Sequence, residues 1–559
     1  MTLPYEPAAD LANRLLHDHA VSRIWNRDIS VWSAEPGSDA AKSIASRLGW
    51  LDVGATMPPH LERLAALGRA AREEHIESVY LLGMGGSSLC AEVLRSVYGV
   101  AQGSPELYVL DTTDEQTLTT AAARMVPERT WVIVASKSGG TVEVASMERF
   151  FWSRISAALA QRAGRQFIAI TDPGTSLEQL AATRGYRETF INPADIGGRF
   201  SALSLFGLVP TALIGGPAKD LLAAGTAMAD GCRQENHANA GLELGAFIAA
   251  ATLAGRDKLT VVLPASLSML GLWIEQLIAE STGKQGKGAL PVVDEPLGGP
   301  EHYGQDRAFV AIATDRDAPD KDKLAALHAA GHPILHLTTR LDGLGAEFFR
   351  WEFATAIAGA GLKINPFDEP NVAEAKGKTK ALLGGYAANH RLPEPEPTAK
   401  SGDVAVFTHG FAGNAPADVI RAAIAEEVKP GDYVAFLSYL PPEAATEAVV
   451  AGIRQAIGTK TRAATTFGVG PRYLHSTGQY HKGGPNTALV FLVTADDRTQ
   501  TEIPEAGYSF SVLKRAQALG DYETLAAHGR RVVRIHVTGE NPGRSLQSLF
   551  EQALSAATA

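Results

Sequence analysis

Short, uninterrupted apolar runs that alternate with helical stretches are the feature that most constrains the fold of this chain. The first four runs lie at residues 79–83, 107–111, 131–135 and 167–171. A strand that is apolar on both faces is typical of a parallel sheet, because helices cover both sides of such a sheet. The sequence therefore predicts a doubly wound α/β unit, which we place at residues 76–235.

The same pattern returns in the second half of the chain. A second unit is expected over 236–392, with strands at 259–264, 308–313 and 333–337 and helices at 267–282, 320–330 and 346–360. A third α/β region is expected over 400–559, with strands at 404–407, 433–437, 488–493 and 532–537. The Pro- and charge-rich stretch 391–402 is typical of a linker. Residues 1–75 carry apolar residues at helical spacing, which predicts a helical lead-in.

Composition restricts the partners of the chain. A length of 559 residues suggests two to four domains, and a net charge of −10 argues against nucleic acid or an acidic membrane as a partner. Cys90 and Cys232 are too few for a disulfide framework or a zinc site, and we expect both to be buried. The sequence shows neither a membrane-length apolar run nor a signal peptide, so we expect a cytoplasmic protein.

The turn after the run 131–135 has the chemistry of an anion site. Ser136, Ser138 and Thr141 provide hydroxyl donors, Lys137 provides positive charge, and paired glycines stand between them. Because a helical pattern follows, backbone N–H groups at the helix start could also bind a phosphate. The other interpretation is an ordinary strand-to-helix connection, which uses the same residue types.

A second glycine-rich turn follows the first strand, at residues 83–89. It reads Gly-Met-Gly-Gly-Ser-Ser-Leu, which permits close approach of the backbone to a ligand. The third glycine of a dinucleotide fingerprint is absent, although Asp111 at the end of the next strand could bind a ribose hydroxyl. A dinucleotide would leave the turn at 136–141 unexplained, so we favour a small phosphorylated ligand.

Two charged residues are candidates for the chemistry. Arg199 stands between glycines and a serine, where it could enter a cleft and face a phosphate or an oxyanion, or it could be a surface arginine. Glu280 ends a mostly apolar helix, where desolvation would raise its pKa and make it a proton-transfer base. The alternative for Glu280 is a solvated helix end, and composition does not separate it from Glu275.

Taken in order, these segments resemble those of the phosphoglucose isomerase family. Residues 83–88 resemble its first glycine turn, 136–141 its Ser-Lys-Thr phosphate loop, and 196–201 (Ile-Gly-Gly-Arg-Phe-Ser) its signature. Glu-Ser-Thr-Gly-Lys at 280–284 is similar to its Glu-Ser-Asn-Gly-Lys. Ile-Asn-Pro-Phe-Asp-Glu-Pro-Asn-Val at 364–372 is similar to its Ile-Asn-Pro-Phe-Asp-Gln-Pro-Gly-Val.

The resemblance implies a fold and an activity. It implies two sugar-isomerase (SIS) domains, a homodimer, and interconversion of D-glucose 6-phosphate and D-fructose 6-phosphate without a metal or an organic cofactor. The variant that the chain resembles most is the isomerase half of bacterial transaldolase–phosphoglucose isomerase fusions. A transaldolase barrel needs about 250 residues, and fewer than 80 precede the first strand. We therefore expect an isomerase alone.

The resemblance also assigns roles to individual residues. Arg199 would stabilise the cis-enediolate, and Glu280 would move the proton between C2 and C1. The phosphate would be bound by Ser136, Lys137, Ser138 and Thr141, and the sugar would be lined by Gly86 and Ser87.

The residues that the resemblance assigns to ring opening match the family motifs less well. The family uses a His downstream of the Glu, often from the partner subunit, and His302 is the candidate, although the Gly-Gln-His order of many members reads Gly-Gln-Asp at 304–306. It also uses a Lys that follows a Gln by several residues near the C-terminus. Lys482 with Gln479 is the candidate pair, at too short a spacing, and His475 and His481 compete with Lys482.

Three alternatives remain at this stage. The first is a non-catalytic sugar-phosphate sensor, which the presence of Glu280 and Arg199 and the acidic charge disfavour. The second is an aminating isomerase, which needs an N-terminal nucleophilic Cys, whereas Met1 is followed by Thr2. The third is a dual phosphoglucose/phosphomannose isomerase, because epimerisation at C2 could proceed through the same enediolate.

Overall fold

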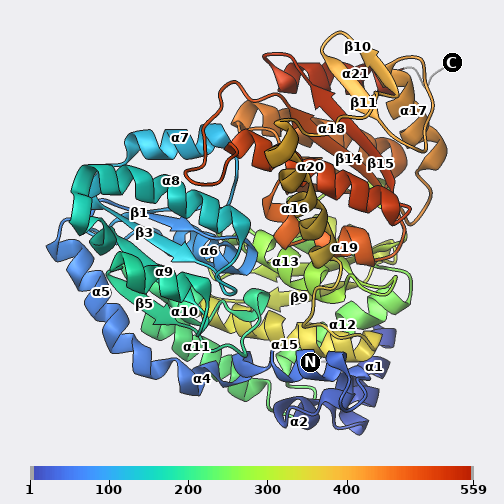
Figure 1. Cartoon of the computed structure of the whole chain (residues 1–559). Helices are drawn as coiled ribbons and strands as arrows, with labels where there is room; N and C mark the ends of the chain where they lie inside the picture. Colours follow the sequence, from blue (N-terminus) through green and yellow to red (C-terminus); the bar gives the residue numbers. More distant parts are fainter. Residues whose placement is uncertain (1–4, 556–559) are drawn as a thin grey trace.

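A computed structural model describes residues 5–555 and shows a helical N-terminal segment, as predicted. Its α-helices are α1 (Glu6–His17), α2 (Ala20–Trp25), α3 (Asp39–Ala45), α4 (Val53–Thr56) and α5 (Leu61–Glu73). In α1, the buried residues Ala8, Leu11 and Leu15 recur at three- and four-residue spacing, which gives the helix one apolar face. In Figure 1, α1, α2 and α4 lie at the lower edge of the molecule, and α5 runs along its left side.

The first sheet is parallel and five-stranded, in the order β2-β1-β3-β4-β5. Its strands are β1 (Ser78–Leu82), β2 (Glu106–Leu110), β3 (Thr130–Ala135), β4 (Phe167–Thr171) and β5 (Glu188–Ile191). Val79 and Leu81 of β1 belong to one hydrophobic cluster, and Tyr80 and Leu82 belong to another. Both faces are therefore buried, by α6 (Leu89–Tyr98), α7 (Glu115–Arg124), α8 (Val142–Leu159), α9 (Ser176–Arg184) and α10 (Leu205–Leu213).

The second sheet is parallel and four-stranded, in the order β7-β6-β8-β9. Its strands are β6 (Lys258–Val262), β7 (Leu290–Val292), β8 (Arg307–Ala313) and β9 (Ile334–Thr338). The helices of this half are α11 (Ala218–Gly231), α12 (Ala240–Leu253), α13 (Leu270–Thr282), α14 (Lys321–Ala329), α15 (Leu344–Leu362) and α16 (Val372–Asn389). In α13, every residue except Leu272 is buried, so the helix carries its polar residues inside the molecule.

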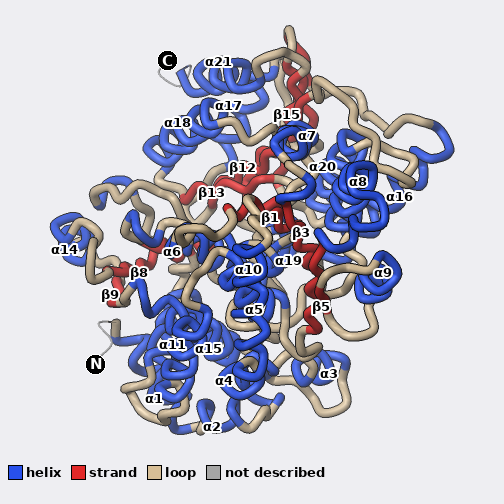
Figure 2. The backbone as a smooth tube through the Cα atoms, turned by 90° about the vertical axis from the view of Figure 1, so that its left-hand side faces the viewer, coloured by secondary structure: helices blue, strands red, loops and turns tan. Residues whose placement is uncertain are grey.

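The third sheet is mixed and six-stranded, in the order β10-β11-β15-β14-β12-β13. It contains β10 (Ala399–Ser401), β11 (Val404–Phe407), β12 (Tyr433–Ser438), β13 (Ala464–Val469), β14 (Ala488–Ala495) and β15 (Arg531–Val537). Its helices are α17 (Pro416–Glu427), α18 (Ala444–Thr461), α19 (Gly478–Gly483), α20 (Phe510–Ala527) and α21 (Pro542–Ser555). Helices α17, α18 and α21 lie on one side of this sheet (Figure 2). The linker predicted at 391–402 is wrong at its end, because β10 pairs antiparallel with β11.

The third region packs against both halves that precede it. Ile503, Phe510 and Leu513 join the hydrophobic cluster on one face of the first sheet. Tyr433 and Tyr480 share another cluster with residues of α13 and β7. Helix α16 packs on α20, and α19 packs on α13 (Figure 1). This packing brings the segment around α19 close to the end of α13.

Two expectations about single features can be checked at this level. Cys90 and Cys232 are both buried and both free, as expected. Within residues 5–555, the helices all fall short of the combination of length and apolar character that crossing a membrane requires.

Candidate active site

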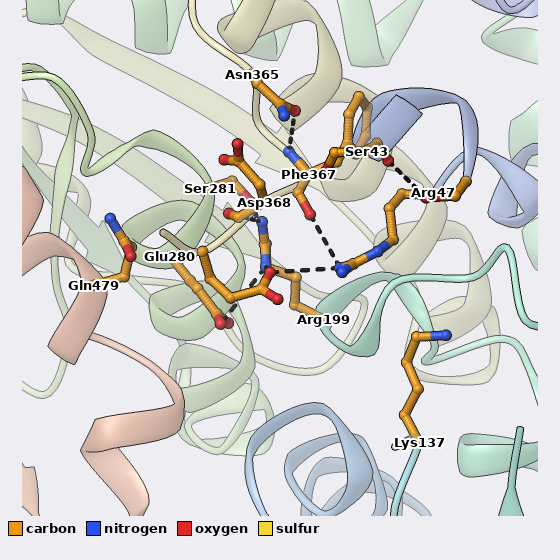
Figure 3. A network of polar contacts seen from close by, with 12 residues as sticks. Ser43, Arg47, Lys137, Arg199, Glu280, Ser281, Asn365, Phe367, Asp368 and Gln479 are labelled. Atoms are coloured by element: carbon orange, nitrogen blue, oxygen red, sulfur yellow. Dashed lines mark hydrogen bonds and ion pairs between the residues drawn. The ribbon is translucent and has the colours of Figure 1, made fainter. Parts of the chain in front are cut away.

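Arg199 lies at the centre of a buried polar cluster, on the 3-10 turn Gly198–Phe200. Its Nε donates to Ser281 Oγ at 2.7 Å. Its Nη2 donates to two backbone carbonyls, those of Pro366 at 2.8 Å and Asp368 at 2.9 Å. Figure 3 shows Ser281 and Asp368 around this guanidinium. The two family-like segments at 280–284 and 364–372 are therefore joined through one arginine.

Two carboxylates face the remaining nitrogen of Arg199. Nη1 donates to Glu369 Oε2 at 3.2 Å and lies 3.6 Å from Glu280 Oε1 (Figure 3). Burial raises the pKa of Glu280, Arg199 opposes that effect, and the charge of Glu369 adds to it. Burial would also raise the pKa of Glu369, but Arg199 and Arg47 hold it below its usual range. The pair thus consists of an ionised Glu369 and a Glu280 that is poised as a proton acceptor.

Contact with Arg199 distinguishes Glu280 from Glu275. Both carboxyl groups are on α13 and both are buried. Burial, and then the charge of Asp294, raise the pKa of Glu275 to about 8. Desolvation alone therefore does not identify the base. What separates the two carboxyl groups is the ion pair between Glu280 and Arg199.

Lys284 fixes the same two segments from the other side. Its buried Nζ donates to the carbonyl of Asn365 and to Asp368 Oδ1, each at 2.7 Å. Burial, helped by the charge of Arg199, lowers the pKa of Lys284 to about 8. Its contacts are with the protein, so Lys284 positions the backbone that Arg199 contacts.

The predicted glycine turn lies against the arginine turn. A Cβ on Gly86 would lie 2.0 Å from the carbonyl oxygen of Gly198, so only glycine allows the two backbones to meet. Ser201 Oγ also donates to the carbonyl of Gly86 at 3.2 Å. Ser87 is buried beside this contact. Gly86 and Ser87 therefore lie beside the turn that carries Arg199.

The predicted phosphate loop joins β3 to α8. Ser136 is buried, and its Oγ lies 3.1 Å from Thr141 Oγ1. Among the described residues, no side chain caps the first turn of α8, so its backbone N–H groups remain available to an anion. Gly139 has a φ of +67° and touches Thr175, which makes glycine necessary there.

Two members of the predicted phosphate set are placed differently. Lys137 Nζ pairs with Asp172 and donates to the carbonyl of Ala194 at 2.8 Å. Its positive charge is therefore directed to the end of β4 and away from the loop, and Figure 3 shows it apart from the arginine cluster. Ser138 is exposed. The hydroxyls of Ser136 and Thr141 are the pair that the fold brings together.

Within residues 5–555, His302 makes no contact with Arg199 or Glu280. It ends the 3-10 turn Pro300–His302, and its side chain is 45% exposed. Its Nδ1 lies 3.1 Å from Glu301 and 3.3 Å from the carbonyl of Gly299. These contacts are local, so nothing in this chain directs His302 toward the site.

Lys482 is buried in a separate network, which corrects its assignment to the sugar site. Its Nζ pairs with Asp521 Oδ1, and the hydroxyl of Tyr473 donates to Asp521 Oδ2 at 2.7 Å. Both residues of this ion pair are almost completely shielded from solvent. Lys482 therefore stabilises the segment that carries Tyr473, and within residues 5–555 it makes no contact with the arginine cluster.

Gln479 and His481 also hold the structure together. Gln479 Nε2 donates to the carbonyl of Gly283 at 2.9 Å and to Asn371 Oδ1 at 2.8 Å, and its Oε1 accepts the N–H of Asn371. His481 Nδ1 lies 2.8 Å from the hydroxyl of Tyr433, and burial lowers the pKa of His481 to about 3. All polar atoms of the Gln479 side chain are thus engaged by protein groups.

Lys376 is a residue that the sequence interpretation missed. It is exposed on α16, and its charge acts on the carboxyl of Glu143 in the first turn of α8. The signal was available, because Glu369 stands where the family motif has Gln and Lys376 follows it by several residues. Lys376 is therefore a further candidate for the lysine of the family, although the residue that precedes it in the motif is Glu369 and not Gln.

Comparison with known proteins agrees with this geometry. The family model described as phosphoglucose isomerase matches residues 53–304. A glucose-6-phosphate isomerase of Rubrobacter xylanophilus is 29% identical, with 59% of this chain and 88% of that protein covered. One from Thermus thermophilus is 30% identical, with 52% of this chain and 67% of that protein covered.

Solved structures share the fold. A hypothetical protein from Thermus thermophilus aligns with a TM-score of 0.57 at 24% identity, over 67% of this chain and 95% of that one. A glucose-6-phosphate isomerase from Chlamydia trachomatis aligns with a TM-score of 0.50 at 20% identity, over 67% of this chain and 79% of that one. With the motifs of Gly86, Arg199 and Glu280 in contact and these relatives beside them, the chain belongs to the phosphoglucose isomerase family.

Proposed function

We propose that the chain is a glucose-6-phosphate isomerase that interconverts D-glucose 6-phosphate and D-fructose 6-phosphate through a cis-enediolate. The observation that carries the proposal is the buried Glu280 carboxylate against Arg199, in the same site as the Gly86 turn. The glucose-6-phosphate isomerases among its relatives support the choice of substrate. The carboxylate supplies the base, and the arginine supplies the positive charge that this chemistry needs.

Glu280 would move one proton. In the open-chain aldose, its carboxylate removes the proton from C2, whose acidity comes from the neighbouring C1 carbonyl. The electron pair moves into a C1–C2 double bond, and O1 gains negative charge. Glu280 then returns the proton to C1 as the C2 carbonyl forms. A pKa raised by burial suits this task, since it makes the carboxylate a stronger base.

Arg199 would stabilise the enediolate from its Nη1 side. Its Nε and Nη2 are engaged by Ser281 and two backbone carbonyls, so the guanidinium is held in one orientation. Only Nη1 faces the carboxylates. A positive charge that is already oriented in a dry site stabilises developing negative charge without reorganisation. The same charge also keeps Glu280 ionised.

The proposal is tested with one coupled assay on the purified protein. Fructose 6-phosphate is supplied, and the formation of glucose 6-phosphate and of mannose 6-phosphate is followed separately. We expect glucose 6-phosphate, and its absence would refute the proposal. Mannose 6-phosphate in the same assay would identify the chain as a dual phosphoglucose/phosphomannose isomerase.

Replacing Ser136 and Thr141 together by Ala tests the phosphate loop. Each hydroxyl bond to a charged phosphate is worth about 1.5–3 kcal/mol, so kcat/KM should fall by at least about 100-fold. KM should rise and kcat should also fall, because binding energy at the phosphate positions C1 and C2 at the carboxylate. Thr183→Ala on α9 is the matched control, and an equal loss in that variant would contradict the assignment.

Replacing Glu369 by Gln tests the carboxylate pair. The charge of Glu369 raises the pKa of Glu280, so its removal should lower that pKa. The base then remains ionised at lower pH, and the acid limb of the kcat–pH profile should move down by about one pH unit. The profile of Glu62→Gln, a surface change on α5, should match that of the unaltered protein. An upward shift for Glu369→Gln would contradict the interpretation.

The oligomeric state, the cellular location and the domain division are proposed on the basis of the family resemblance. We propose a cytoplasmic homodimer with an N-terminal segment (1–75), two SIS domains (76–235 and 236–392) and a C-terminal region (400–559). The three sheets, one in each of the last three segments, support this division. Sedimentation velocity on the purified protein tests the dimer, and a monomer at micromolar concentration would refute it.

A further inference from the structure

One short segment of the third α/β region lies against the site described above. The 3-10 turn Arg472–His475 follows β13 and lies against the Gly85–Ser87 turn. We infer that His475 in this turn is the acid–base residue that opens the sugar ring, supplied by the same chain that carries Glu280. This inference rests on the proposed function, and it assigns the ring-opening role to a residue other than His302 or Lys482.

The backbone of His475 is fixed to the catalytic carboxylate through one amide. Gln276 Nε2 donates to Glu280 Oε2 at 3.2 Å and to the carbonyl of His475 at 2.8 Å. A Cβ on Gly85 would lie 3.0 Å from the Cβ of His475. The absence of a side chain at Gly85 therefore lets His475 pack directly against the glycine turn.

The imidazole of His475 is held by a second carboxylate. Its Nε2 lies 2.9 Å from Glu143 Oε1, which also accepts a bond from Gln517 Nε2 at 2.7 Å. Burial alone would raise the pKa of Glu143, but His475 and Lys376 lower it overall, so this carboxylate is ionised. Nε2 therefore carries the proton in the Glu143 contact. Nδ1 has no hydrogen-bond partner within residues 5–555.

Through its two contacts, His475 is linked to two parts of the proposed site. Glu143 is in the first turn of α8, directly after the phosphate loop, whereas Gln276 leads to Glu280. The imidazole thus lies between the group that binds the phosphate on C6 and the base that acts on C1 and C2. In glucose 6-phosphate, the ring oxygen joins C5 to C1. In the bound sugar, this oxygen would therefore lie between the phosphate site and Glu280, as the imidazole does.

The two residues that follow His475 are Ser476 and Thr477. The hydroxyls of Ser476 and Thr477 are buried and lack a hydrogen-bond partner in the part of the chain that the structure describes. Unpartnered buried hydroxyls are costly in a protein interior. The segment that directly follows His475 carries this cost.

One imidazole can perform the ring opening without a co-reactant. Neutral His475 accepts the proton of the C1 hydroxyl on Nδ1, and the C1=O1 double bond forms as the C1–O5 bond breaks. The electron pair of that bond goes to O5, which takes the same proton back from Nδ1. The cation that exists in between is stabilised by Glu143, which acts as a positioning residue. For fructose 6-phosphate, the same transfer opens the ring at C2.

The experiment separates ring opening from isomerisation. Glu280→Gln blocks isomerisation, so exchange between the α and β anomers of glucose 6-phosphate in that variant reports ring opening alone. It is measured by NMR exchange spectroscopy on the full-length protein. Adding His475→Gln should lower the enzyme-dependent exchange rate between about 100- and 10,000-fold. The matched control, His328→Gln on α14, should leave it unchanged.

Glu143→Gln provides a second variant that keeps an oxygen acceptor for Nε2 but removes the charge. We expect a smaller loss of anomer exchange, with the affinity for glucose 6-phosphate in calorimetry and the melting temperature unchanged. A purely structural role for Glu143 would instead lower affinity and melting temperature together with the exchange rate.

Three results would overturn the inference. The first is full anomer exchange in the variant that carries both Glu280→Gln and His475→Gln. The second is loss of anomer exchange when His302→Gln is added instead. The third is that the unaltered protein isomerises the sugar phosphate while the Glu280→Gln variant shows no anomer exchange. Co-expression of the Glu280→Gln and His475→Gln chains tests the single-chain origin, since recovered isomerase activity would place the two residues on different subunits. If the unaltered protein neither isomerises nor exchanges anomers, the proposed function itself fails.

Discussion

Glu280→Gln is expected to lower kcat by about 10⁴-fold, the upper end of the effect of removing a general base. The amide has the size of the carboxylate and can still contact Gln276, so the buried site should remain packed. It cannot accept the proton from C2. Because the phosphate loop is unchanged, fructose 6-phosphate should bind with nearly the affinity shown by the unaltered protein. Steady-state kinetics and calorimetry measure the two quantities.

Glu275→Gln is the matched control for this change. Glu275 lies on the same helix, is also buried and also has a raised pKa, but its charged neighbours are Asp294, Arg472 and Arg454. We expect it to retain isomerase activity. If Glu275→Gln lost activity and Glu280→Gln retained it, the assignment of the base would be reversed.

The fold could be predicted wherever strands are central. The predicted strands of the three sheets are present, because a strand with neighbours on both sides needs an apolar surface on both faces. The strands that the pattern missed are β5, β7, β10 and β13, and each of them is an edge strand. Edge strands need less apolar surface. In β13 the sequence is Ala-Thr-Thr-Phe-Gly-Val, and β7 and β10 have three residues each.

The site could be predicted where one short motif supplies both the residue and its setting. Arg199 lies in the motif Ile-Gly-Gly-Arg-Phe-Ser at 196–201, and Glu280 lies near the end of an apolar helix. The assignments that changed depend on a partner distant in sequence. Lys137 is directed away by Asp172, and Lys482 is engaged by Asp521. The sequence shows that a lysine side chain is charged, but only the fold shows which carboxylate it pairs with.

Arg199→Lys is the second large expected effect. Guanidinium presents five donors in one plane, whereas ammonium presents three on a flexible stem. Lys at this position cannot reach Ser281, the two carbonyls and both carboxylates together, so buried groups lose their partners. We expect kcat to fall by about 10²- to 10³-fold, as for the loss of an oriented oxyanion donor. Unfolding in urea should show a loss of about 3 kcal/mol.

The direction of the pH shift separates this effect from simple damage to the fold. Arg199 lowers the pKa of Glu280, so a weaker contact should raise that pKa and move the acid limb of the kcat–pH profile to higher pH. Glu369→Gln should move the same limb to lower pH, because it removes a negative charge. In the double variant, the two opposite shifts should partly cancel while the loss in kcat remains. Shifts of the same sign would show that the limb reports a group other than Glu280.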